Sequence, residues 1–174
     1  MSLKKEINMK FFVSALFLLF SVSLFGQIKE VPKANLNTKD GEAVEIQEYT
    51  QNGKPKLISL WATWCGPCRM ELSALDKVYD DWKEKYDLEI VAASVDIPPM
   101  LKNAKAMFDK NGWEFTFLHD NKKELIDALG IRGIPYSILV DGSGKVKSVQ
   151  QGYFRGYEEQ LEKKIAAMMT EGGK

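Results

Sequence analysis

The sequence predicts a single α/β domain with a mixed central sheet flanked by helices. Two short apolar runs, at 56–62 and 88–95, are typical of buried strands, and each is followed by a segment with the periodicity of a helix. A turn sequence at 141–144 (DGSG) separates two further strand-like segments, which predicts an antiparallel hairpin at one edge of the sheet. The length of 174 residues fits one domain.

The first half of the domain is expected to contain a hairpin, a strand and a long helix. The turn signal at 40–41 (DG) lies between Leu36 and the alternating stretch 43–46, which predicts an N-terminal hairpin. Residues 56–62 (KLISLWA) form the first buried strand. A long helix is then predicted by apolar residues at three- and four-residue spacing: Leu72, Leu75, Val78, Tyr79, Trp82 and Tyr86.

The second half alternates strands and helices. After the strand at 88–95, the prolines at 98–99 break the chain, and the apolar spacing at 101–108 marks a helix that Gly112 can end. The remaining expected elements are a strand at 115–118, a short helix at 123–129 capped by Gly130, strands at 136–140 and 145–151, and an amphipathic helix at 158–169.

The composition excludes several classes of function. Lys and Arg number 24, as do Asp and Glu, so no basic excess indicates a nucleic-acid partner. The two cysteines are too few for a disulfide framework, and with one histidine they cannot complete a four-ligand zinc site. We therefore expect no nucleic acid, no metal and no cofactor.

The N-terminal segment has the pattern of a targeting sequence. Lysines precede the uncharged run at 11–25, and small residues follow, so cleavage after Ser23 or Gly26 is expected. The run is shorter than the roughly 20 residues of a spanning helix, but an uncleaved membrane anchor and a buried helix of the domain stay as alternatives. The expected division is 1–26 as signal peptide or anchor and 27–174 as the domain. The domain is then extracytoplasmic, either secreted or N-terminally anchored, and touches a membrane at most through this segment.

The motif with the clearest chemistry is WATWCGPCR at 61–69, where a strand ends and a helix begins. A thiol at a helix N-terminus faces unpaired backbone N–H groups, so the pKa of Cys65 should fall below its usual value. Pro67 suits the first helical turn, and Cys68 can reach Cys65 from one turn inside the helix. We interpret Cys65 as the exposed nucleophile and Cys68 as the resolving thiol; a structural disulfide and two inert buried thiols are the alternatives. Trp64 is expected to shield the Cys65 sulfur, or only to pack.

WCGPC after a buried strand, together with GIRGIP at 130–135, resembles thioredoxin, and the likeness covers about residues 56–169. The resemblance implies the thioredoxin fold and a cis peptide bond before Pro135 that faces the two sulfurs, the alternative being a trans loop proline. It also implies a set of substrate contacts: Trp64, Gly66, Pro67, Ile134 and Pro135.

The chain resembles the extracytoplasmic TlpA/ResA group of thioredoxin-like proteins more closely. The early hairpin and the inserted helix–strand segment at 101–118 fit this group. Ser59 stands where thioredoxin has a buried aspartate, and the resemblance implies that Glu71 instead accepts a proton from Cys68, directly or through water. The alternative is that Glu71 is a solvated helix carboxylate. His119, beside Asp120, is expected to be a surface turn residue.

These patterns predict a thiol–disulfide oxidoreductase in which Cys65 and Cys68 exchange a disulfide with protein substrates. Family likeness implies reduction outside the cytoplasm, renewal by a membrane electron donor, and a role in cytochrome c maturation or general disulfide repair. One alternative is a thiol peroxidase, but Ala62 does not match the Thr/Ser that peroxiredoxins place before their cysteine, and Thr63 is misplaced. Another is a non-enzymatic carrier that holds an extended protein in the cis-proline groove.

Overall fold

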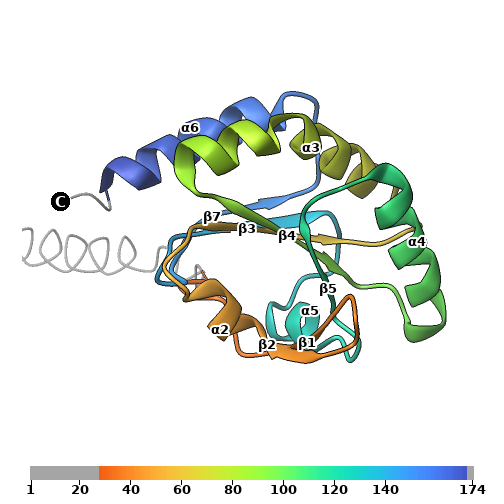
Figure 1. Ribbon diagram of the computed structural model, residues 1–174. Coiled ribbons are helices and arrows are strands. Elements are labelled where there is room, and N and C mark those ends of the chain that lie inside the picture. The colour runs from red at the N-terminus through yellow and green to blue at the C-terminus, as the bar shows by residue number, and fades with distance from the viewer. Residues whose placement is uncertain (1–27, 172–174) are drawn as a thin grey trace, which may run out of the picture.

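A seven-stranded mixed sheet with helices on both faces forms the protein (Figure 1). The computed structural model describes residues 28–171, so the predicted signal or anchor segment at 1–26 lies outside the described residues. The strand order is β2-β1-β5-β4-β3-β6-β7. No helix within the described range is long and apolar enough to cross a membrane.

The elements follow the predicted order. The strands are β1 (Asn35–Thr38), β2 (Ala43–Glu45), β3 (Lys56–Trp61), β4 (Glu89–Ser94), β5 (Thr116–His119), β6 (Tyr136–Val140) and β7 (Val146–Gln151). The helices are α2 (Ile46–Thr50), α3 (Gly66–Tyr86), the 3-10 turn η1 (Pro98–Met100), α4 (Leu101–Asn111), α5 (Glu124–Ala128) and α6 (Tyr157–Glu171). Two of the described elements were not predicted. One is the 3-10 turn η1, where we expected the prolines only to break the chain. The other is α2: Ile46, which we assigned to a strand, is fully buried at the start of this short helix.

Strand β3 lies inside the sheet, between β4 and β6, and all six of its residues are buried. It pairs in parallel with β4 and antiparallel with β6. Because both faces of this strand are covered, its sequence is a continuous apolar run rather than an alternating one. The predicted β6–β7 hairpin forms an antiparallel edge of the sheet.

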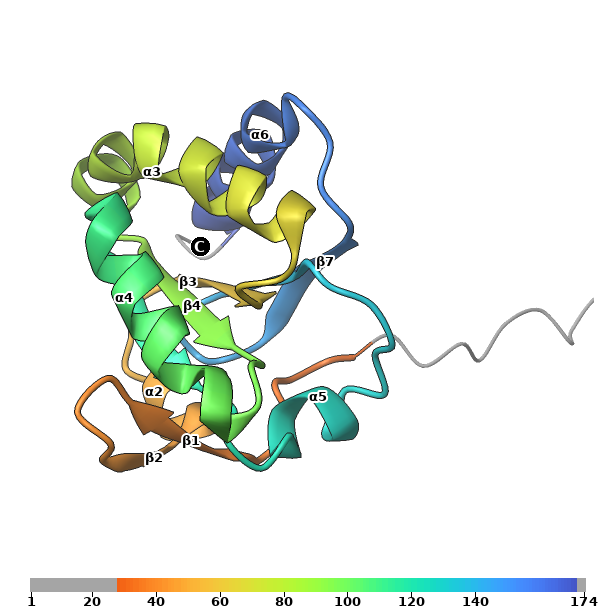
Figure 2. The ribbon, with the colours of Figure 1, turned by 90° about the vertical axis from the view of Figure 1, so that its right-hand side faces the viewer.

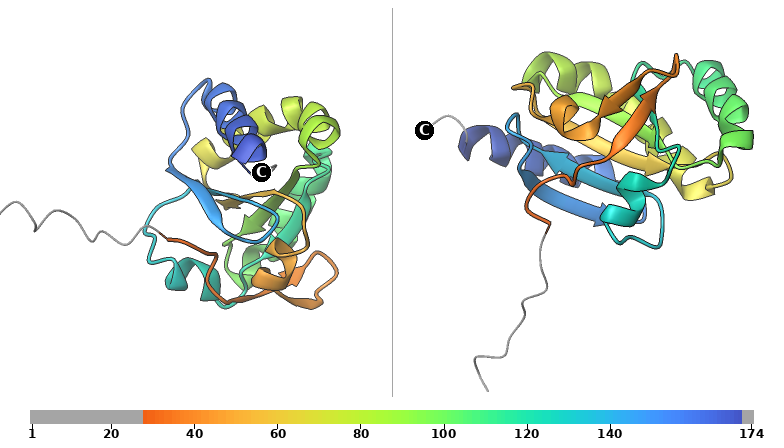
Figure 3. Two further views of the ribbon diagram at one scale, coloured as in Figure 1. Left: turned by 90° about the vertical axis from the view of Figure 1, so that its left-hand side faces the viewer. Right: turned by 90° about the horizontal axis from the view of Figure 1, so that it is seen from below.

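Helices α3 and α6 cover one face of the sheet, while α2 and α5 lie on the opposite side (Figures 1 and 3). The predicted apolar stripe of α3 faces inward, and the buried face of this helix also includes Cys68 and Glu71. This orientation follows from the three- and four-residue spacing, which gathers side chains on one face of a helix.

The inserted segment attaches through aromatic packing. Helix α4 crosses the side of the molecule next to α3 (Figure 2). Phe108 on α4 contacts Trp113 and Phe117 edge to face, with ring centroids 5.7 and 5.3 Å apart. Trp113 in turn meets Trp61 of β3 at 5.7 Å. Edge-to-face pairs stabilise beyond the burial of apolar area, so this cluster joins the insertion to β3.

Candidate active site

Cys65 is the residue that caps the N-terminus of α3. Its backbone is extended, with φ −87° and ψ 101°, and its Sγ accepts the backbone N–H of Cys68 at 3.2 Å. Pro67 stands in the first turn, where a missing N–H removes no helical hydrogen bond. The two sulfurs form a disulfide, with the Cα atoms 5.3 Å apart. The helix N-terminus thus presents an N–H donor to the sulfur of Cys65, as the motif predicted.

The Ile134–Pro135 peptide bond is cis and lies beside the disulfide. The register of the sheet explains its position, since Tyr136 at the start of β6 pairs with Leu60 near the end of β3. The residues just before β6 therefore meet the chain just after β3. The carbonyl oxygen of Ile134 lies 3.8 Å from Sγ of Cys65.

The two cysteines differ in exposure, although less than expected. Cys65 is 5% exposed and Cys68 is completely buried, so the outer sulfur is Cys65 but most of it is covered. Trp64 is 68% exposed, which shows that it does not pack into the core. Cys65 is therefore not the exposed residue that the motif predicted, although its neighbours Trp64 and Pro67 are exposed.

A groove of about 390 Å³ opens on the cis-proline side of the disulfide, and we call it the cis-proline groove. Its wall includes Trp64, Ile131, Gly133 and Ile134. Gly133 leaves little room for a larger residue, because a Cβ there would stand 3.0 Å from the side-chain nitrogen of Gln151. Apolar side chains, including Trp64, Ile131 and Ile134, form much of its wall, which suits an extended peptide segment.

Glu71 is completely buried, which shows that the alternative of a solvated helix carboxylate is wrong. Its two carboxylate oxygens accept hydrogen bonds from the hydroxyls of Ser59 and Ser137, each at 2.7 Å. The two serines face each other in the β3–β6 register, so both present a hydroxyl toward α3. Burial raises the pKa of Glu71, and the two serine hydroxyls partly oppose this rise.

The position of Glu71 suits proton transfer at Cys68. Both residues belong to the buried face of α3, one helical turn apart. A carboxylate whose pKa is raised by burial is a stronger base than an ordinary glutamate. The same carboxylate also contributes to raising the pKa of buried Tyr157 at the start of α6, although burial is the larger cause.

The sequence did not single out an anchor for the loop before Cys65. The carboxylate of Asp96, only 1% exposed, accepts the backbone N–H of Thr63 at 2.9 Å and its hydroxyl at 2.8 Å. Ser94 donates to the same carboxylate at 3.0 Å. One feature of the sequence could have indicated this anchor. Asp96 is a polar residue directly after a buried strand, at the carboxyl end of the sheet where α/β proteins bind ligands.

His119 and Asp120 are not surface residues, so that expectation is wrong. Each is 1% exposed, because His119 pairs with Ser94 of β4 inside the sheet and Asp120 is buried just before the exposed turn at 121–122. Nε2 of His119 lies 2.7 Å from the carbonyl oxygen of Asp96, and Asp120 accepts the backbone N–H groups of Leu125 and Ile126. Two consecutive polar residues resembled a turn, but each has buried partners.

A thioredoxin-like fold with a cysteine pair at a helix N-terminus and a cis-proline loop beside it defines a thiol–disulfide oxidoreductase. Comparison with known proteins agrees, and the chain belongs to the AhpC/TSA family, whose model matches residues 28–149.

Relatives of the same kind are found among curated proteins and solved structures. The thiol-disulfide oxidoreductase ResA of Halalkalibacterium halodurans is 32% identical over 126 residues, which is 72% of this chain and 67% of that protein. An uncharacterized thioredoxin-like protein from Porphyromonas gingivalis has a TM-score of 0.74 at 34% identity, covering 83% of this chain and 94% of the other. A thiol:disulfide interchange protein from Bacteroides sp. has a TM-score of 0.65 at 25% identity, covering 78% and 87%.

Proposed function

We propose that this oxidoreductase reduces disulfides in protein substrates outside the cytoplasm, with Cys65 as the attacking thiolate and Cys68 as the resolving thiol. The observation that carries the proposal is the position of the Cys65 sulfur, which accepts a helix N-terminal N–H and lies beside the Ile134 carbonyl. The N–H favours the thiolate in the reduced protein, and the cis-proline loop offers backbone to an incoming chain.

The exchange proceeds in two steps that balance without a cofactor. The Cys65 thiolate attacks one sulfur of the substrate disulfide, forms a mixed disulfide and releases the other substrate sulfur as a thiolate. Cys68 then loses its proton and attacks the Cys65 sulfur, which releases the second substrate thiol. The protein leaves with the Cys65–Cys68 disulfide, the state seen in the structure.

Glu71 accepts the proton of Cys68 in the second step, directly or through a water molecule. Its burial supports this role, because burial raises the pKa of its carboxyl group. The serine pair supports it as well, since Ser59 and Ser137 hold the carboxylate in place while it changes charge. In this proposal the carboxylate replaces the buried aspartate that thioredoxin has at the position of Ser59.

The residues around the Cys65 sulfur contact the substrate. Trp64 offers an exposed aromatic surface, while Gly66 and Pro67 leave the approach to Cys65 free of bulky side chains. Pro135 has no N–H, and the backbone of Ile134 pairs with an extended substrate segment in the cis-proline groove. The same contacts serve any substrate that presents a cystine in an extended chain.

The proposed net direction of disulfide exchange and the proposed cellular compartment are based on the resemblance to the family. The Gly66-Pro67 dipeptide between the cysteines resembles that of reducing thioredoxins, so we propose net reduction. The apolar run at 11–25 supports an extracytoplasmic location, secreted or anchored. A membrane electron donor then returns Cys65–Cys68 to the dithiol, and the client reactions belong to cytochrome c maturation or general disulfide repair.

The two cysteines provide matched variants for a test. Cys65→Ser should lose more than about 99% of insulin disulfide reduction, because the attacking sulfur is absent. Cys68→Ser should also stop turnover but accumulate a mixed disulfide on Cys65, which mass spectrometry of trapped substrate measures.

Three other results would contradict the proposal. Cys65→Ser could retain turnover. Thiol loss within seconds of mixing with hydrogen peroxide, without insulin reduction, would favour a thiol peroxidase. Equal client binding by the double Cys→Ser variant, with no redox change in cells, would favour a non-enzymatic carrier.

A further inference from the structure

A second groove begins on the other side of the cysteine pair. It has a volume of about 900 Å³ and lies between α3 and α4, with Gly66 at one end and Tyr153 and Arg155 from the segment after β7 on its wall. We call it the α3–α4 groove. It shares no lining residue with the cis-proline groove. Gly66 directly follows Cys65, so a chain attached to that sulfur can enter this groove as well.

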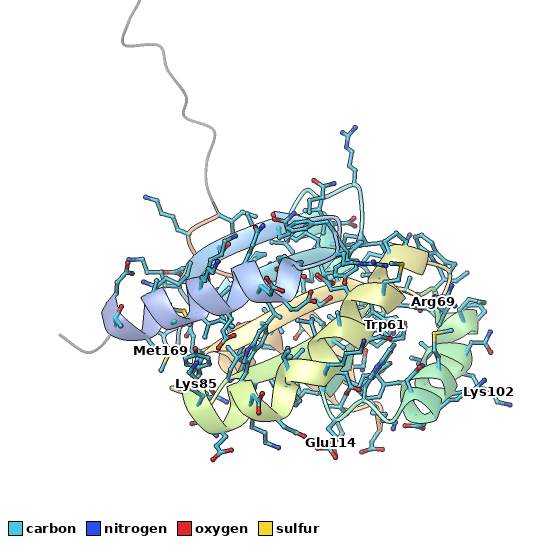
Figure 4. The ribbon with its side chains drawn as sticks, turned by 90° about the horizontal axis from the view of Figure 1, so that it is seen from above. Trp61, Arg69, Lys85, Lys102, Glu114 and Met169 are labelled. Carbon is cyan, nitrogen blue, oxygen red and sulfur yellow. A yellow bond between two sulfur atoms is a disulfide. The ribbon has the colours of Figure 1, made fainter. Side chains whose placement is uncertain are left out.

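The α3–α4 groove is lined by cations and by no acidic side chain. Its cations are Arg69, Lys77, Lys110 and Arg155, and all four are exposed. None of them forms an ion pair with another residue between 28 and 171, whereas several lysines elsewhere do. Figure 4 shows Arg69 at the beginning of α3, on the side where Lys102 of α4 also lies. Within the described range, neither an acidic lining residue nor an ion pair therefore neutralises the positive charge of the groove.

The charge is local, because the whole chain has a formal net charge of zero. The cis-proline groove contributes Lys123 and Arg132 against a single acid, Asp127. Together the two grooves beside the disulfide hold six cations and one anion among their lining residues. A neutral protein that concentrates positive charge around its reactive sulfur attracts negative partners to that place and repels positive ones.

The groove also offers apolar surface. Met70 on α3 is 58% exposed and Met107 on α4 is half-buried, while Trp113 is buried and lines the same groove. Methionine is flexible and polarizable, so it adapts to apolar side chains of different shape. Ala74 and Ala106 leave space between these larger residues. The groove thus fits a segment that combines acidic groups with a few apolar side chains.

We propose that the α3–α4 groove binds an acidic, partly apolar segment of the substrate protein whose disulfide Cys65 attacks. The proposal rests on the proposed reduction of protein disulfides and adds the chemistry by which substrates are chosen. A substrate held in both grooves places its cystine at the sulfur between them. The cations act mainly on encounter and binding, so their effect appears in KM and decreases with salt.

A pair of cystine peptides tests the proposal on the full reduced chain. One peptide has glutamates beside its disulfide, and the other has glutamines at the same positions. We expect wild type to reduce the acidic peptide with a kcat/KM about tenfold higher at low salt, through a lower KM. The double variant Lys77→Glu/Lys110→Glu should abolish or reverse this preference, and 0.5 M salt, roughly a 4 Å screening length, should also weaken it in wild type.

A matched control changes the charge by the same amount outside the groove. Lys145→Glu/Lys163→Glu alters two exposed lysines that do not line the groove, and it should keep the preference for the acidic peptide. Reaction with the uncharged small disulfide 2,2′-dithiodipyridine should be unchanged in every variant. If reduced wild type did not react with this small disulfide, the proposed function itself would be refuted, and not only the proposal for the groove.

Two outcomes would overturn the groove proposal alone. The first is equal reduction of both peptides by wild type, or an unchanged preference in Lys77→Glu/Lys110→Glu, with normal reaction toward the small disulfide. The second is a dimer in sedimentation that this double variant dissociates, which would assign the groove to a second copy of the chain.

Discussion

At the scale of single residues, the least expected feature is the buried carboxylate of Glu71. A carboxylate removed from water is costly unless hydrogen bonds replace its hydration. Ser59 and Ser137 supply those bonds from neighbouring strands, each at 2.7 Å. No cation forms an ion pair with Glu71 among the residues that the structure describes. The charged form therefore stays disfavoured, which is why the pKa of Glu71 is raised.

This raised pKa predicts a particular dependence of stability on pH. The folded protein keeps the proton of Glu71 to a higher pH than the unfolded chain does. The associated stability is present below the usual glutamate pKa and is lost as the pH rises through the folded-state value. As the pH rises across this range, the free energy of unfolding of Glu71→Gln relative to that of wild type should therefore increase by at most about 1.4 kcal/mol per pH unit.

Urea unfolding of the oxidised protein from about pH 4 to about pH 8 measures this difference. Glu84→Gln, on the exposed side of the same helix, serves as the control and should show a smaller pH-dependent difference. A constant difference between wild type and Glu71→Gln at every pH would contradict the prediction.

At the scale of elements, the inserted helix α4 depends on its aromatic contacts. Phe108 is 4% exposed and contacts three aromatic rings, those of Trp113, Phe115 and Phe117. Through Trp113 these contacts reach Trp61, two residues after Ser59 in β3. The insertion is therefore part of the core, and its position determines the shape of the α3–α4 groove.

Truncation of Phe108 should show how firmly α4 is held. Phe108→Ala removes a buried ring and leaves a cavity, so we expect the free energy of unfolding to fall by about 3–5 kcal/mol. Phe154→Ala removes a ring that is 39% exposed and should cost much less. Chemical denaturation of both variants provides the comparison, and equal losses would show that the cluster is not what anchors the insertion.

At the scale of the whole molecule, the site exists because the sheet brings distant segments together. Residue 59 on β3, residue 71 on α3 and residue 137 on β6 meet around one carboxylate. The segment before β1 also packs into the core of the domain, since Val31 is 1% exposed and Ala34 is 2% exposed. Gln47 donates to the carbonyl of Val31 at 2.8 Å, and Lys29 accepts the N–H of Val146 at 2.8 Å.

These contacts predict where the domain can be shortened. A chain that begins at Ile28 keeps every contact described above and serves as the reference. A chain that begins at Asn35 loses the buried side chain of Val31 and its hydrogen bond, which should lower the free energy of unfolding by about 2–4 kcal/mol. Urea denaturation of both chains tests this. Equal free energies of unfolding for the two chains would show that residues 28–34 do not stabilise the domain.

Much of the fold was predictable because local patterns and tertiary structure agree. Strand β6 matches its predicted range, and the periodicity of α3 identified its buried face. The short helix α2 was missed, because alternation over four residues does not distinguish a strand from the start of a helix. His119 was misplaced because exposure is not a local property: polar residues stay buried when neighbouring elements supply their hydrogen bonds.

The reactive cysteine pair was readable from the amino-acid sequence alone, because two cysteines one turn apart at a strand–helix junction are typical of thiol–disulfide exchange. The groups that support this pair became known only from the folded arrangement. It buried Glu71 between two serines from different strands, tied Thr63 to Asp96, and opened a cationic groove beside Gly66. The physical reason is that helix capping depends on neighbours within one turn, whereas burial and groove charge depend on residues far apart in the chain.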